Sequence, residues 1–300
     1  MMKAEVPVPT VLGWRADAAG EASGLQALWS RVGELGWLRP NPADHPLVVL
    51  QIGERGRSPL VIRTARRLVE FLREGWPALA IDVLDPVAQA DEWDGLRLRS
   101  GGDAVTLSGI AASRGLAVPS LWFTPFYLIT VAAVGPEPVT RLAGVLDAQA
   151  DPLRRLRNPY APSTLIYEAH RLAASDLSVA CGHARWNHGD TERWWAVGTD
   201  DVAVDQVVAS AAGIDPMQLP MLQSLARHEL VATHVELQGS LPRLHGYVVP
   251  AWKARIRAAR LRVTGSHRAV AHDLALVRRN LRKIPGYVRR QLGTRRGSQQ

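Results

Sequence analysis

The feature that most constrains the fold is a strand–helix–strand pattern near the start of the chain. Residues 46–52 (PLVVLQI) form a short, continuous apolar run, which is typical of a strand buried on both faces. Ser58 and Pro59 then predict a helix start, because serine accepts backbone N–H bonds at an N-cap and proline is tolerated in the first turn. The helix is expected to run to about Glu74 and to be followed by a strand over 77–84. A strand, a helix and a strand at this spacing predict a βαβ unit with parallel strands.

The same alternation of apolar and amphipathic segments continues to about residue 239. It predicts an α/β fold, with a mostly parallel sheet sandwiched by helices. Further strands are expected over residues 117–121, 127–134, 177–181 and 193–197. Further helices are expected over residues 25–38, 105–114, 139–148 and 163–174.

The chain is expected to have three parts. They are an irregular segment and a helix over residues 1–45, an α/β domain over 46–247, and a basic amphipathic helical tail over 248–300. From Ala251 to the end, 14 Lys and Arg stand against a single acid, a net charge of +13. Because the whole chain carries +8, residues 1–250 carry −5. The C-terminal appendage is therefore a cationic segment on an acidic body.

Two interpretations of this basic tail are open. Its apolar face, from Val270 to Ile284, packs on the α/β body or on a second subunit of a homo-oligomer, with arginines on the outside. Alternatively, the tail contacts an anionic partner: an acidic protein, a membrane surface or nucleic acid. Deleting residues 251–300 separates them, because insoluble protein indicates packing, whereas a soluble body that no longer binds vesicles or DNA indicates a binder.

Composition excludes several classes of protein. The single cysteine, Cys181, cannot form an internal disulfide or a cysteine-ligated iron–sulfur cluster. No apolar window is long enough for a transmembrane helix, and the N-terminus lacks the apolar core of a signal peptide, which predicts a cytoplasmic protein. Neither GxGxxG, GxxxxGK[ST] nor GxSxG is present, so no nucleotide cofactor or serine nucleophile elbow is predicted. The Ala- and Arg-rich composition is typical of bacterial proteins.

The most patterned stretch is residues 198–239. Asp200 or Asp201 is placed to cap a helix, Gly213 to end it in a left-handed conformation, and Asp215 with Pro216 to begin another. Folding alone explains each of these residues. An alternative is that Asp200, Asp201 and Asp205 present carboxylates at the carboxyl edge of the sheet, where they bind a divalent metal.

This stretch resembles the C-terminal signature of the family known as domain of unknown function 362. The resemblance is carried by Gly198, Asp200, Val202, Ala203, Val204, Asp205, Gly213, Ile214, Asp215, Pro216, Leu219 and Pro220. It implies an α/β fold with a closing strand, and it does not supply a reaction. The chain departs from the family pattern: a Lys and a His of the middle motif are missing near Pro119, Cys181 stands where an acid is expected, and the iron–sulfur cysteines are absent.

A polar loop over residues 181–192 lies directly before this stretch. His183, His188, Asp190 and Cys181 are the candidate catalytic residues, as an acid–base set or a nucleophile with its base. The candidate substrate-binding residues are Arg185, Trp186, Trp122 and Tyr127. The competing interpretations are a solvated loop, a small buried cysteine and aromatic residues of the core.

We expect this loop to meet Asp200 and Asp201 at the carboxyl edge of a parallel sheet. The sequence therefore favours a small-molecule enzyme, of the kind found in bacterial specialised metabolism, with a polar site at that edge. The alternative is a non-catalytic accessory or binding protein that uses its basic C-terminal helices.

Overall fold

The computed structural model describes residues 8–17, 19–41, 47–52, 58–85, 93, 95–99, 104–107, 116–119, 125–134, 170, 174–185 and 191–244. The chain divides after Val248 into two compact units, and all of these residues belong to the first. The helix predicted over 139–148, most of that predicted over 163–174, and the basic tail lie outside the described residues. The function proposed for the tail therefore stays a prediction.

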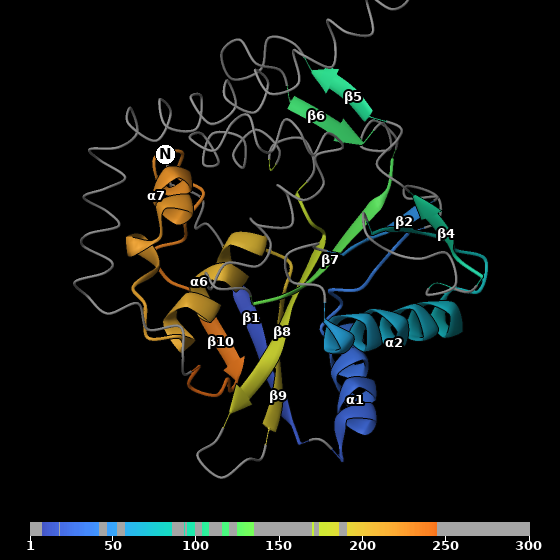
Figure 1. Cartoon of the computed structure of the whole chain (residues 1–300), viewed down its shortest axis with the longest axis horizontal. Helices are drawn as coiled ribbons and strands as arrows, with labels where there is room; N and C mark the ends of the chain where they lie inside the picture. The colour runs from blue at the N-terminus through green and yellow to red at the C-terminus, as the bar shows by residue number, and fades with distance from the viewer. Residues whose placement is uncertain are drawn as a thin grey trace, which may run out of the picture. The chain divides into compact units, whose positions relative to one another are not determined.

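The described residues form an α/β fold around an eight-stranded sheet of order β10-β1-β9-β8-β7-β2-β3-β4 (Figure 1). The strands are β1 (Thr10–Ala16), β2 (Leu47–Ile52), β3 (Ala80–Leu84), β4 (Arg97–Arg99), β7 (Tyr127–Ala133), β8 (Leu177–Arg185), β9 (Thr191–Gly198) and β10 (Glu236–Gly239). All of them run parallel except β9, which lies antiparallel to both β1 and β8. The predicted mostly parallel sheet is confirmed.

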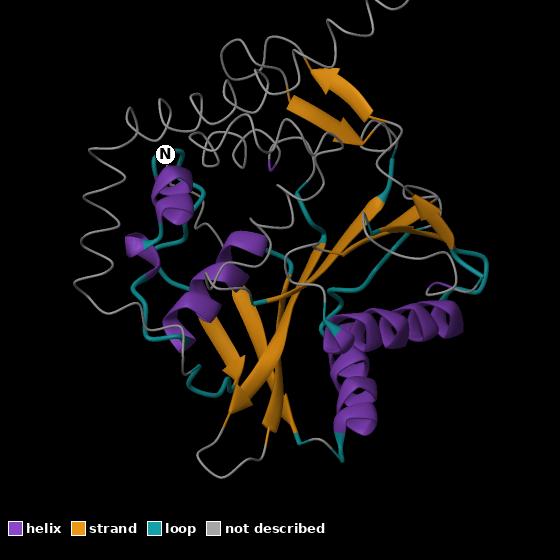
Figure 2. Cartoon of the chain, in the orientation of Figure 1, coloured by secondary structure: helices purple, strands orange, loops and turns teal. Residues whose placement is uncertain are grey.

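Helices cover both faces of the sheet (Figure 2). The helices α1 (Glu21–Glu34) and α2 (Pro59–Gly75) pack on one face, where Leu28, Trp29 and Leu68 join a core with β2, β7 and β8. The helix α6 (Asp201–Ala211) packs on the other face against small residues such as Ala180 and Ala196. A short 3₁₀ turn, η3 (Pro216–Gln218), and α7 (Pro220–Ala226) follow. Among the described helices, none is long and apolar enough to cross a membrane.

The strand–helix–strand prediction is confirmed in detail. The run over 46–52 forms β2, and the segment over 77–84 contains β3. Ser58 caps α2, with its Oγ accepting a hydrogen bond from the Val61 amide at 3.3 Å. The strands β2 and β3 pair in parallel, as the βαβ unit requires.

The irregular segment predicted before the helix over 25–38 is wrong for residues 10–16. Thr10–Ala16 form β1, which lies inside the sheet between β9 and β10. Gly13 interrupts the apolar pattern of this strand and pairs with Gly239 of β10. A Cβ on Gly239, whose φ is +81°, would meet the Gly13 carbonyl oxygen at 2.3 Å. The two glycines allow the backbones to approach closely. Gly13 also interrupts the run of apolar side chains by which a strand is recognised in a sequence.

The helix predicted over 105–114 is also wrong at its start. Residues of that segment belong to β5 (Ala104–Leu107), which pairs antiparallel with β6 (Leu116–Pro119) in a separate two-stranded sheet. Val105 and Thr106 are β-branched and favour a strand, and this preference outweighs the apolar spacing.

Candidate functional site

The strands β8 and β9 form an antiparallel hairpin that separates two groups of residues predicted to meet. The sequence places a loop over 182–192, but β8 continues to Arg185 and β9 begins at Thr191. Ser178 pairs with Gly198 at one end of the hairpin, and Arg185 pairs with Thr191 at the other. At about 3.3 Å per residue, the two ends are roughly 23 Å apart. The predicted convergence of the 181–192 loop with Asp200 and Asp201 at one edge is therefore wrong.

The predicted catalytic and substrate-binding residues are placed as follows. His183 is exposed on β8, at the carboxyl edge of the parallel strands. His188, Asp190, Trp186 and Trp122 lie outside the described residues, and for Arg185 the structure describes only the backbone.

Cys181 and Tyr127 belong to the core. Cys181 is fully buried on β8, and burial raises the pKa of its thiol to about 12, although a hydrogen bond with Thr64 works in the other direction. The thiol is therefore protonated at neutral pH and shielded from solvent, which favours the small buried residue over the nucleophile. Tyr127 donates a hydrogen bond from its hydroxyl to the Trp37 carbonyl oxygen at 2.6 Å, and burial raises its pKa to about 12.

The three aspartates predicted to bind a metal have separate structural environments. Asp200 caps α6, its Oδ1 accepting hydrogen bonds from the amides of Val202 at 2.9 Å and Ala203 at 3.0 Å. Asp201 is 2% exposed, and its Oδ2 lies 3.3 Å from Nδ1 of His170. Asp205 is a fully buried residue of α6. Within the part of the chain that the structure describes, no three His, Cys, Asp or Glu side chains are grouped to hold a metal ion.

Replacing Asp200 tests its role as a cap. Burial raises the pKa of Asp200, so the folded state favours the protonated acid, and this stabilisation is lost as the pH rises. We expect Asp200→Ala to lower the free energy of unfolding by about 1 kcal/mol at pH 7, because two amides lose their acceptor. Asp200→Asn keeps the acceptor without a buried charge and should be at least as stable as the wild type. Urea denaturation at pH 7 measures both, and an Asn variant as unstable as the Ala variant would contradict the capping role.

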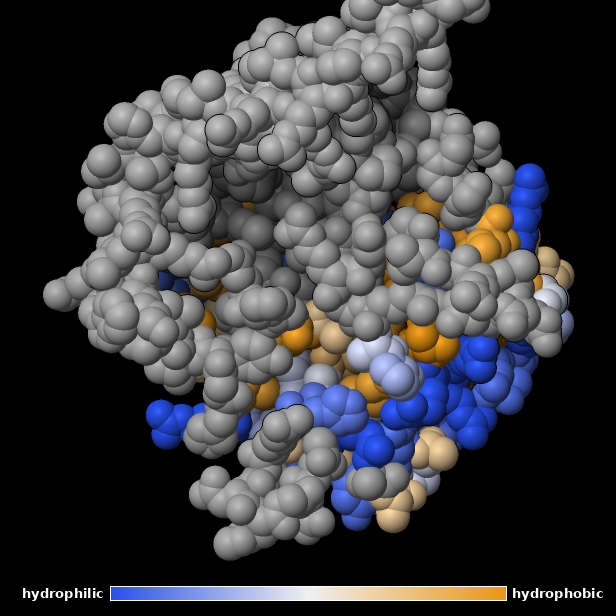
Figure 3. All heavy atoms as spheres, in the orientation of Figure 1, coloured by the Kyte–Doolittle hydropathy of each residue, from blue (hydrophilic) through white to orange (hydrophobic). Residues whose placement is uncertain are grey.

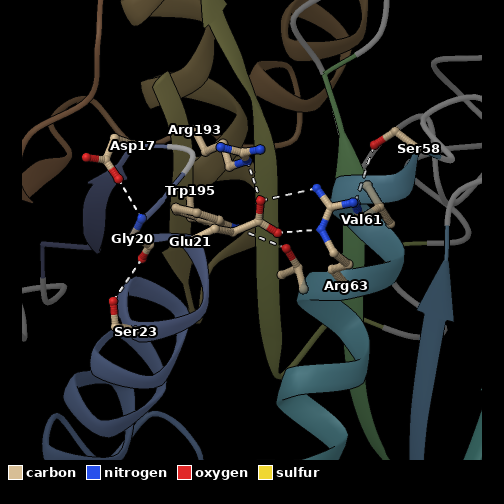
Figure 4. A network of polar contacts seen from close by, with 10 residues as sticks. Asp17, Gly20, Glu21, Ser23, Ser58, Val61, Arg63, Arg193 and Trp195 are labelled. Atoms are coloured by element: carbon tan, nitrogen blue, oxygen red, sulfur yellow. Dashed lines mark hydrogen bonds and ion pairs between the residues drawn. The ribbon is translucent and has the colours of Figure 1, made fainter. Parts of the chain in front are cut away.

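A second cluster of polar side chains lies at the carboxyl edge, where β1 leads into α1, β2 leads towards α2, and β9 begins. Glu21 is the first residue of α1, Arg63 lies in the first turns of α2, and Arg193 lies near the start of β9 (Figure 4). Arg63 donates from Nε to Oε1 of Glu21 at 2.5 Å and from Nη2 to Oε2 at 3.2 Å. Arg193 Nε approaches the same Oε2 as an ion pair without a directed hydrogen bond.

This three-residue contact, which we call the Glu21 cluster, is shielded from solvent. The side chains of Glu21 and Arg193 are 12% and 16% exposed, whereas Arg63 is 47% exposed. The hydrogen bonds that Arg63 donates to Glu21 raise the pKa of Arg63. Trp195 lies beside Glu21 in Figure 4 and donates from Nε1 to Oγ1 of Thr64 at 2.9 Å.

An open groove of about 580 Å³ adjoins the Glu21 cluster. We call it the arginine groove, and its polar walls carry four arginines and two glutamates, a net charge of +2. They are Glu21, Arg63, Arg66, Arg67, Glu70 and Arg193. Ala19, Ala22 and Leu25 of the α1 side form the apolar part of the wall. Figure 3 shows hydrophilic side chains gathered over α1 and α2 on the face that it presents.

His183 is the predicted site residue that lies beside this cluster. It pairs directly across the hairpin with Arg193, so both side chains project on the α1 and α2 face of the sheet. Partial burial lowers the pKa of His183 from its ordinary value of 6.5, and the charges of Arg193 and Arg63 lower it further. The imidazole is therefore neutral at pH 7 and able to accept a proton.

The residues that the sequence prediction missed are Glu21, Arg63 and Arg193. None of them belongs to a motif, since they come from three elements that are distant in the chain. A usable signal existed for Arg63 alone: a helix that follows a parallel strand begins at the carboxyl edge of the sheet, so the first turns of the helix predicted from Ser58 were candidates for this edge. Glu21 lies before the helix predicted over 25–38, where no strand was predicted, and had no such signal.

Comparisons of the chain with protein-family models, with curated proteins and with solved structures find no match. The resemblance of residues 198–239 to domain of unknown function 362 therefore stays a prediction.

Proposed function

We propose that the protein binds a small anionic molecule in the arginine groove. The observation that carries the proposal is the convergence of Arg63, Arg66, Arg67 and Arg193 on one groove, whose walls include two carboxylates among the described residues. Residues 1–250 together carry a net charge of −5, so the net charge of +2 on the walls of the groove is a local concentration of positive charge in an acidic part of the chain.

The dimensions and position of the groove support this proposal. Its volume of about 580 Å³ falls within the range of roughly 300–1,000 Å³ that is usual for small-molecule sites. It adjoins the carboxyl ends of the parallel strands, where open α/β sheets bind ligands. Arginine suits an anion here, because its planar fork of N–H donors matches the oxygens of a carboxylate or phosphate. The apolar wall formed by Ala22 and Leu25 adds contact for the uncharged body of such a ligand.

A series of anions of increasing charge tests the proposal. Isothermal titration with acetate, inorganic phosphate and pyrophosphate should give affinities that rise with the charge of the anion and weaken at high salt, because the attraction is electrostatic. Glycerol serves as the neutral control and should not bind. Equal affinities across the series, or binding by none of the anions, would exclude the proposed function.

We also propose that His183 is the proton-accepting group of this site, which would make the protein an enzyme acting on a small anion. A neutral imidazole beside an anion-binding groove is suited to accept a proton from the bound molecule. Nuclear magnetic resonance titration should give His183 a pKa below 6.5 in the free protein, and bound pyrophosphate should raise it. A pKa that stays constant while pyrophosphate binds would remove His183 from the site.

A further inference from the structure

We infer that Glu21 is an internal substitute for the anionic group of the ligand, which binds by displacing this carboxylate from Arg63 and Arg193. This inference rests on the proposed function, because it describes how the arginine groove accepts its ligand. It also specifies the ligand class: a molecule that bears a phosphate group, whose three terminal oxygens satisfy more donors than a carboxylate does.

The geometry of the Glu21 cluster supports the view that the Glu21 carboxylate occupies the place of a ligand's anionic group and is not an ordinary surface ion pair. Both oxygens of Glu21 lie in the fork of Arg63, at 2.5 and 3.2 Å, and Arg193 contacts one of them from the opposite element. This is the arrangement in which arginines hold a carboxylate or phosphate from a ligand. Glu21 and its two arginines also line the groove, so a ligand in the groove reaches the same donors.

Arg193 indicates a ligand with more acceptors than Glu21 offers. Its Nη1 is buried and has no hydrogen-bond partner among the described residues. A buried donor without an acceptor is unfavourable, and proteins usually leave few of them. A carboxylate has two oxygens, and both are engaged by Arg63. A phosphate has a third terminal oxygen, which would offer Nη1 the acceptor that it lacks beside Glu21.

The start of α1 allows Glu21 to leave. Glu21 is the first residue of the helix, and Gly20 at the N-cap supplies no side-chain hydrogen bond. The turn before it is held by a local contact, in which the Gly20 amide donates to Oδ1 of Asp17 at 2.5 Å. Rotation of one side chain at a helix end therefore opens the cluster, while the core contacts of Leu25 and Leu28 stay in place.

Displacement has a measurable cost in affinity. If the protein spends most of its time with Glu21 on the arginines, only the remaining fraction is competent to bind, and the apparent affinity falls by that fraction. Removing the charge of Glu21 should therefore tighten phosphate binding. A glutamate that only oriented Arg63 and Arg193 would have the opposite effect, because its removal would leave the arginines less ordered.

The experiment compares Glu21→Gln with Glu34→Gln in the full-length protein, using inorganic phosphate as the probe. Glu34 is a matched control, because it pairs with Arg31 on the same helix and lies outside the groove. We expect Glu21→Gln to bind phosphate roughly tenfold more tightly than the wild type, as the loss of one charge-assisted competitor implies. Glu34→Gln should bind as the wild type does.

The outcomes separate this inference from the proposed function. If wild type and Glu21→Gln both fail to bind phosphate and pyrophosphate, the proposed function fails and this inference fails with it. If the wild type binds and Glu21→Gln binds equally or more weakly, only this inference is overturned. Should Glu21→Gln not fold, Glu21→Asp decides, because the shorter side chain keeps its charge but cannot reach both arginines, and it should bind phosphate more tightly than the wild type.

Discussion

Replacing Trp195 with alanine is expected to lower the free energy of unfolding by about 3–5 kcal/mol, the largest stability effect that we predict for this site. Trp195 is fully buried on β9 and packs in the core below α1 and α2. The alanine variant leaves a cavity of the size of an indole ring and removes the hydrogen bond that Trp195 Nε1 donates to Thr64 Oγ1 at 2.9 Å. Thr64 also contacts Cys181, so the loss disturbs a shared packing unit.

Urea denaturation measures this effect, with Trp195→Phe as the intermediate variant. Phenylalanine refills most of the volume but donates no hydrogen bond, so it should cost about 1–3 kcal/mol. A loss below about 1 kcal/mol for Trp195→Ala would contradict the assignment of this residue to the core. Far-ultraviolet circular dichroism of the native variants checks that the secondary structure is retained before the comparison is made.

Replacing Arg193 with glutamine is expected to weaken the binding of pyrophosphate roughly tenfold to a hundredfold. A hydrogen bond to a charged group contributes about 1.5–3 kcal/mol, and the side chain of Arg193 is only 16% exposed, so little solvent screens its charge. Glutamine keeps polar atoms at the position and therefore separates the loss of charge from the loss of a polar group. Isothermal titration calorimetry at constant salt measures the change in affinity.

Arg31→Gln is the control for this variant. It removes the same charge from the same unit, but Arg31 pairs with the exposed Glu34 and lies outside the groove. Its affinity for pyrophosphate should match that of the wild type within about twofold, as expected for a screened, distant charge. Equal losses in the two variants would mean that only the net charge of the protein matters and that the groove is not the site.

The sequence was a good guide to the elements whose signals are local. Ser58 and Pro59 predicted the start of α2, and Gly213, with a φ of +71°, predicted the end of α6. The cap of α6 was predicted to be Asp200 or Asp201, and it is Asp200. Each depends on a few neighbouring residues. The strand β1 was missed because its register depends on Gly13 lying against Gly239, more than two hundred residues away in the chain.

The candidate site was predictable only in its location. The carboxyl edge of the parallel strands is the correct edge for His183, and the α/β alternation was enough to indicate it. The antiparallel course of β9 carries Asp200 and Asp201 to the opposite edge, and no local pattern distinguishes an antiparallel return from a parallel one. The Glu21 cluster depends on tertiary contacts, since Glu21, Arg63 and Arg193 meet only once α1, α2 and β9 are assembled.

The most direct test of the account follows the arginine Nε–H resonances by nitrogen-15 nuclear magnetic resonance while pyrophosphate is added. If pyrophosphate occupies the arginine groove, the resonances assigned to Arg63 and Arg193 by their glutamine variants should shift and saturate at a single affinity, and that of Arg31 should stay in place. Shifts at Arg31 or other arginines that leave Arg63 and Arg193 unchanged would contradict the proposed anion site.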